Sequence, residues 1–184
     1  MRKIVILSSL LIIAAACAPP DKGVDSDKPQ APPPGTASAA QVHGNLQQVM
    51  RGILFPNSNV IFAAQGNDPS KVKPASDPST ATDPLASTYG GWTAVENAGL
   101  ALAESANLLM VPGRMCQNGK PVPLQNPDWP GFVQGLRDAG MEAYKAAQSK
   151  NTDKILDAAN TMTTACMNCH DKYREKPNEQ DRCM

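Results

Sequence analysis

The sequence predicts an all-α protein, an antiparallel four-helix bundle that carries a C-x-x-C-H motif on its last helix. Three observations support this fold class. Apolar residues recur at steps of three and four in four separate segments, which is the spacing of helices with one buried face. No segment alternates convincingly between apolar and polar residues, as a half-buried strand does. The connections suit antiparallel neighbours, as in four-helix bundles.

The first helical segment is expected over residues 40–65. Its apolar positions are Val42, Leu46, Val49, Met50, Ile53 and Leu54. Pro56 should end or kink this helix near Phe55, because proline lacks the backbone N–H. The apolar pattern then resumes at Val60, so we expect a second helical piece. Residues 67–91 contain three Asp-Pro pairs, and we interpret them as a mobile surface loop.

Three further helices follow. The second spans residues 92–111, although Gly99 weakens the pattern because glycine is a poor helix former. Residues 114–130 hold four prolines and form a loop, in which Asp128 or Asn126 can cap the third helix. Asn151 or Thr152 starts the last helix. Its apolar face includes Ile155, Ala159, Met162, Cys166, Cys169 and Tyr173.

The N-terminal segment indicates export. Residues 1–16 combine a positive start with an apolar run that is too short for a spanning helix, which needs roughly 20 residues. We interpret them as a lipoprotein-type signal peptide, with Cys17 as the acylated residue. Ala14 departs from the leucine usual at that position, and the alternative is ordinary cleavage, which would leave a soluble periplasmic protein. Residues 17–41 then form a flexible Pro/Ala-rich tether, and residues 42–184 the bundle.

The net charge of the chain and its expected location outside the cytoplasm limit which functions and partners are expected. The chain has 17 basic and 17 acidic residues; without Arg2 and Lys3 the balance is 15 against 17, or −2. This gives no basic excess, so we expect no nucleic-acid partner. Outside the cytoplasm, cysteines that are not otherwise used tend to form disulfides. The helices are rich in alanine and only 4% of the chain is aromatic, so a large apolar cofactor would help to fill the core.

The motif Cys166-x-x-Cys169-His170 predicts one covalent haem c. Cysteines three apart on a helix place both sulfurs on one face, which suits two thioether bonds to one porphyrin. His170 shares that face and can be the proximal iron ligand. Zinc is the first alternative, but a structural zinc site needs four ligands and the motif supplies three. A disulfide or redox pair is the second, and it would not need His170.

The segment "CMNCHDKYR" resembles the last helix of the class II c-type cytochromes, the cytochrome c′ family, whose motif is C-x-x-C-H-x-x-Y-R. Cys166, Cys169, His170, Tyr173 and Arg174 match it. The resemblance covers about residues 42–176. It leaves out the N-terminal tail, the Asp-Pro loop and the end of the chain, and the two middle loops depart from the compact family pattern.

The sixth iron position depends on the first helix. That helix runs antiparallel to the last one, so its first turns lie level with His170. Met50 and His43 are the two side chains there that can bind iron. Met50 is inside the apolar pattern and can equally be a core residue, whereas His43 can be solvated. In the family that the motif resembles, a methionine on the first helix is the ligand in some members, and the iron is five-coordinate in others.

Two further contacts are expected. Arg174 can pair with a haem propionate, or it can simply favour the helix dipole as a basic residue near a C-terminus. Cys116 and Cys183 remain once Cys17, Cys166 and Cys169 are assigned, and they follow helices that are parallel in such a bundle. We therefore expect a Cys116–Cys183 disulfide at one pole.

These observations lead to a membrane-tethered monohaem cytochrome that passes single electrons to redox protein partners outside the cytoplasm. No nucleophile has a partner histidine, so we expect no enzyme. The alternatives are a five-coordinate haem protein of the same fold that binds NO or CO, and a non-haem structural lipoprotein with a metal site. A homodimer is compatible with an exposed helical face.

Overall fold

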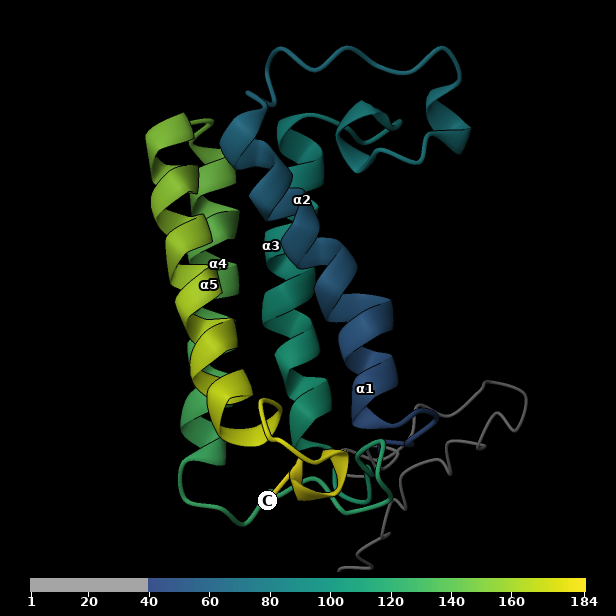
Figure 1. Cartoon of the computed structure of the whole chain (residues 1–184). Helices are drawn as coiled ribbons and strands as arrows, with labels where there is room; N and C mark the ends of the chain where they lie inside the picture. Colours follow the sequence, from purple (N-terminus) through teal and green to yellow (C-terminus); the bar gives the residue numbers. More distant parts are fainter. Residues whose placement is uncertain (1–39) are drawn as a thin grey trace, which may run out of the picture. The chain divides into compact units, whose positions relative to one another are not determined.

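The computed structural model describes residues 40–184, and within them the regular elements are helices, without a strand (Figure 1). The predicted all-α four-helix bundle is confirmed. The predicted signal peptide, Cys17 and nearly all of the tether lie outside the described residues. The longer elements are α1 Leu46–Val49, η1 Met50–Leu54, α2 Phe55–Gly66, α3 Trp92–Ser105, α4 Trp129–Gln148 and α5 Thr152–Tyr173.

The bundle is formed by the combined first helix, α3, α4 and α5. Helix α4 packs against both α3 and α5, and α2 packs against α3 and α5 (Figure 1). The buried core includes Trp129, Ile61, Leu102, Ile155, Met162 and Val95. No helix in residues 40–184 is long and apolar enough to cross a membrane.

The first helix begins at Leu46, later than the residue 40 expected from the sequence. Asn45 and Gln48 form a capping box: the Asn45 side chain accepts from the Gln48 N–H at 2.9 Å, and the Gln48 side chain accepts from the Asn45 N–H at 2.8 Å. These bonds satisfy two donors that a helix start leaves free. The apolar residue Val42 and also His43 therefore precede the helix.

Pro56 does not end the helix, but regular α-helical bonding is interrupted directly before it, and the expected second helical piece, α2, begins at Phe55. The interruption is η1, a wide π turn in which the N–H of Phe55 donates to the carbonyl of Met50. A proline ring in a regular helix clashes with the carbonyl four residues earlier and leaves it without a donor. The wider turn relieves that conflict, and the side chain of Asn57 donates to the carbonyl of Ile53 at 2.7 Å. The α1, η1 and α2 segments consequently form one continuous helix.

Two glycines bring α3 and α4 into backbone contact. A Cβ atom on Gly99 would lie 2.6 Å from the backbone nitrogen of Tyr144, and a Cβ on Gly140 would lie 2.6 Å from that of Ala103. Real Cβ atoms do not approach other atoms so closely. The glycine that weakened the helix pattern in the sequence therefore has a packing role, since it permits the close crossing.

The Asp-Pro pairs of the 67–91 loop share one local structure. The carboxylates of Asp68, Asp77 and Asp83 each accept a hydrogen bond from the backbone N–H two residues later, at 2.9, 3.2 and 2.9 Å. Such turns are typical of aspartate. Leu85 of this loop is buried, and the indole N–H of Trp92 donates to a loop serine hydroxyl at 2.7 Å.

Helix α4 begins where the sequence predicted, with Asp128 at the N-cap position and Pro130 in the first turn. The carboxylate of Asp128, however, does not cap the helix. It accepts instead from the Tyr173 hydroxyl at 2.5 Å and pairs with the Lys172 ammonium at 2.6 Å. A charged partner outweighs a backbone N–H, and these contacts join the start of α4 to the end of α5.

Candidate functional site

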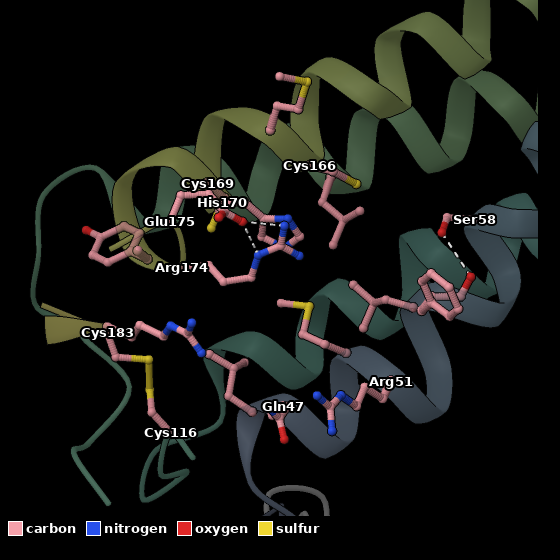
Figure 2. A pocket seen from close by; sticks show the side chains of 18 of the residues that line it. Gln47, Arg51, Ser58, Cys116, Cys166, Cys169, His170, Arg174, Glu175 and Cys183 are labelled. Atoms are coloured by element: carbon pink, nitrogen blue, oxygen red, sulfur yellow. Dashed lines mark hydrogen bonds and ion pairs between the residues drawn. A yellow bond between two sulfur atoms is a disulfide. The ribbon is translucent and has the colours of Figure 1, made fainter. Parts of the chain in front are cut away.

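A cavity of about 1130 Å³ lies between the first helix and α5 (Figure 2). This exceeds the roughly 300–1,000 Å³ of ordinary small-molecule sites. The first helix contributes Leu46, Met50, Leu54, Phe55, Ser58 and Phe62. Leu102 of α3, and Trp129 and Leu136 of α4, also line the cavity. Its walls are largely apolar, which suits a large apolar occupant.

Cys166, Cys169 and His170 all line this cavity from the last turns of α5. Asn151 fixes the start of that helix, because its side chain accepts from the backbone N–H of Lys154 at 3.0 Å. Figure 2 shows the three motif side chains on the side of α5 that faces the first helix. Cys166 and Cys169 are half-buried free thiols and do not pair with each other. The structure thus brings the motif together on one cavity wall.

Burial controls the protonation of these groups. It raises the pKa of the Cys169 thiol to about 11, and the neighbouring Cys166 and Asp128 add to the rise. Burial also raises the pKa of Cys166. For His170, burial first and then the Arg174 charge lower the pKa. Near pH 7 both thiols are protonated and the imidazole is neutral, which leaves a nitrogen lone pair for a metal.

The zinc alternative finds no preformed site. Within residues 40–184, no three or more His, Cys, Asp or Glu side chains are grouped so that they could hold a metal ion.

The two candidates for the sixth iron ligand differ in position. Met50 is half-buried, packs against the core and lines the cavity at the start of η1. His43 is exposed, precedes the helix and is absent from the cavity lining. The expectation that His43 lies in the first turns of the helix is therefore wrong, since the capping box starts the helix after His43.

Tyr173 fixes the end of α5, next to the motif. Its ring is buried and meets Trp129 edge to face, with centroids 5.1 Å apart, and Phe132 similarly at 6.0 Å. Its hydroxyl donates to Asp128 and accepts from Asn126 at 3.1 Å. Because buried tyrosines need such partners, this cluster sets the rotation of the last turn that carries His170.

Arg174 also lines the cavity, but a neighbouring carboxylate already binds it. The Nη2 and Nε atoms of Arg174 lie 2.5 and 2.6 Å from one oxygen of Glu175 (Figure 2). Sequence reasoning missed Glu175 and two other arginines of the lining, Arg51 and Arg182. Arg51 follows Met50 directly, and that was the only sequence signal for it. Arg182 lies beyond any helical pattern and had none.

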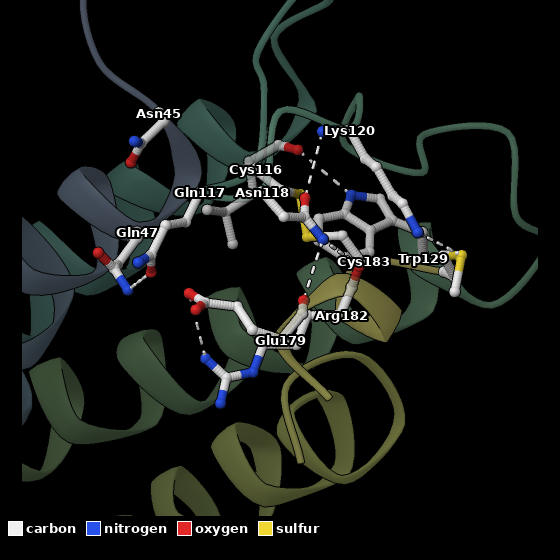
Figure 3. The surroundings of a disulfide bond; sticks show 12 residues. Asn45, Gln47, Cys116, Gln117, Asn118, Lys120, Trp129, Glu179, Arg182 and Cys183 are labelled. Carbon is white, nitrogen blue, oxygen red and sulfur yellow. Dashed lines mark hydrogen bonds and ion pairs between the residues drawn. A yellow bond between two sulfur atoms is a disulfide. The ribbon is translucent and has the colours of Figure 1, made fainter. Parts of the chain in front are cut away.

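Cys116 and Cys183 form the expected disulfide, with Cα atoms 6.5 Å apart (Figure 3). This separation lies within the range that the bond allows. Both cysteines also line the cavity, which the sequence did not indicate. The disulfide therefore belongs to the wall of the site as well as to the pole of the bundle.

No protein-family model matches the chain, and neither characterised proteins nor solved structures show significant similarity to it. The resemblance to class II c-type cytochromes consequently rests on the motif residues and on the fold class.

Proposed function

We propose that this chain is an exported monohaem c-type cytochrome, of the cytochrome c′ type, that passes single electrons between protein partners. The observation that carries the proposal is the shared cavity: Cys166, Cys169 and His170 line one large apolar space with Met50 on the opposite wall. Haem c supplies one-electron chemistry when it is bound. The helices around the cavity supply a largely apolar lining for it.

The residues have distinct roles in this proposal. Cys166 and Cys169 hold the cofactor covalently through thioether bonds, and His170 is the proximal ligand. Tyr173 and Asp128 orient the helix end that carries His170. The neutral state of the imidazole favours coordination.

Met50 is the proposed sixth ligand. Its position in the lining supports this role, and π turns such as η1 are frequent at functional sites. A methionine–histidine pair raises the reduction potential and closes the site to small molecules. A five-coordinate haem protein of the same fold that binds NO or CO is the alternative, with Met50 as a core residue only.

Export and membrane attachment are part of the proposal. The Cys116–Cys183 disulfide is the kind of bond that persists outside the cytoplasm. Lipidation of Cys17 and the tether 17–41 would then hold the bundle near a membrane, within reach of its electron donor and acceptor. Lipid analysis of the mature protein tests this part, and Cys17→Ser is expected to release the protein into the soluble fraction.

Optical spectra of the full chain, produced in a host that attaches haem c, test the central proposal. The wild type should retain haem after denaturation and organic extraction, because the thioethers are covalent. Cys166→Ala combined with Cys169→Ala should lose it to the extract. If the wild type carries no covalent haem, the cytochrome proposal is refuted and the non-haem structural lipoprotein is favoured.

Binding of CO to the ferrous protein tests the sixth ligand. We expect the wild type and His43→Ala to resist CO, and Met50→Ala to bind it at once. His43→Ala is the matched control because it removes the other candidate. If the wild type binds CO as readily as Met50→Ala, the iron is five-coordinate and the gas-binding alternative is favoured.

A further inference from the structure

The last residues of the chain form a wall of the cavity. We call residues 177–184, which follow the last bundle helix, the C-terminal strap. Glu179, Arg182 and Cys183 of the strap all line the cavity. A four-helix bundle is complete without such a segment, so its place at the site needs a separate reason.

The strap is fastened to the loop that precedes α4. The Cys116–Cys183 disulfide joins them covalently, and the side-chain amide of Asn118 donates to the carbonyls of Glu179 and Arg182 at 3.2 and 3.0 Å (Figure 3). Cys183 has a φ of 63°, which is uncommon for a residue other than glycine. Such a conformation persists only where its surroundings determine it. The strap is thus held in one position.

The arginines of the lining differ in how far they are already neutralised. Arg174 has Glu175 at 2.5 Å. The one ion pair of Arg182 within residues 40–184 is with Glu179, at 3.7 Å, and its Nε atom is buried without a hydrogen-bond partner there. Arg51 is exposed, so water already solvates its charge. The side chain of Arg182 is itself 41% exposed, but among the cavity arginines it has the buried nitrogen that no group in residues 40–184 satisfies.

We propose that Arg182, presented by the disulfide-clamped strap, binds a carboxylate of the molecule that occupies the cavity. The inference rests on the proposed function, in which that molecule is haem c and its carboxylates are the propionates. A guanidinium matches a carboxylate with two parallel hydrogen bonds. Arg182 replaces Arg174 in this role, because Glu175 competes for Arg174. The disulfide acts as the positioning element.

The reduction potential of the purified, haem-loaded full chain tests this role. A positive charge near a redox centre favours the reduced state, so Arg182→Gln should lower the equilibrium constant for reduction about three- to tenfold. A tenfold change corresponds to about 59 mV for one electron. Arg182→Lys should restore most of the loss, because it keeps the charge. Arg137→Gln is the matched control, since Arg137 does not line the cavity.

A double-mutant cycle tests the clamp. Cys116→Ser with Cys183→Ser should lower the potential as Arg182→Gln does, and Arg182→Gln should add little in that background. An unchanged potential in Arg182→Gln, or a fall in Arg51→Gln instead, overturns the assignment of Arg182. Full additivity overturns the role of the disulfide. The haem spectrum of the wild type is a separate readout, so the absence of haem identifies failure of the proposed function itself.

Discussion

Replacement of Gly99 by alanine tests the close crossing of α3 and α4. The added Cβ would lie 2.6 Å from the backbone nitrogen of Tyr144, 2.9 Å from the carbonyl oxygen of Gly140 and 3.0 Å from the Tyr144 Cα. All three atoms belong to the backbone of α4. No side-chain rotation relieves the contacts, so the two helices must move apart.

The size of the effect follows from these distances. Ordinary contact begins at 3.4 Å, so the shortest contact requires a separation of about 3.4 − 2.6 = 0.8 Å. A gap of that size forfeits a quarter to a half of each dispersion contact across the interface, and overpacking typically costs about 1–3 kcal/mol. The alanine stabilises the helix by about 1 kcal/mol, because its helix propensity is higher than that of glycine. Taking the upper part of the overpacking range, we expect a net loss of about 2 kcal/mol.

Urea and thermal unfolding, followed by circular dichroism at equal haem content, measure this loss. For a domain of this size, about 2 kcal/mol lowers Tm by roughly 4–8 °C. Gly135→Ala is the control, because Gly135 is also helical and its added Cβ meets nothing within 4 Å. That variant should gain up to about 1 kcal/mol. If Gly99→Ala is as stable as the wild type while the control gains, the backbone contact is not present.

Two further predictions concern the contacts at the end of α5. Tyr173→Phe removes the hydroxyl that bonds Asp128 and Asn126 and should cost about 1 kcal/mol in urea unfolding, with helix content unchanged. Hydrogen bonds from Lys172 and then Tyr173 lower the pKa of Asp128. Its folded pKa lies below the unfolded value, so its stabilisation is present at neutral pH and is lost as the pH falls through the folded pKa. Unfolding curves from pH 7 to pH 2 should show a shallower loss in Asp128→Asn than in the wild type.

Apolar periodicity was sufficient to predict the helices and their order, because each helix buries one face. The position of the motif on the last helix followed from the same pattern. The start of the first helix was missed, although Asn45 and Gln48 stand at the spacing of a capping box. Because Val42 fits the apolar periodicity, the predicted helix started before this capping box. In the structure, the hydrogen bonds of the capping box decide where the helix starts, and Val42 lies outside it.

Contacts between distant segments were harder to predict. The residues next to Asp128 in the sequence predict that it caps a helix. In the fold, its carboxylate instead pairs with Lys172 and accepts a hydrogen bond from Tyr173. Glu175 and Arg182 face the cavity from segments without periodicity, so no pattern marked them. Cys183 was the one residue of the strap whose contact could be predicted, because cysteines without another role tend to form disulfides outside the cytoplasm.

The π turn connects Pro56 to the site. In a regular helix, side chains four residues apart drift by about 40° per step, because a turn takes 3.6 residues. Leu46, Met50 and Leu54 nevertheless all line the cavity at steps of four. A π turn closes its hydrogen bonds over five residues, so it takes up more residues per turn and cancels part of that drift. The wide turn directly before Pro56 thus carries both Met50 and Leu54, and both line the cavity.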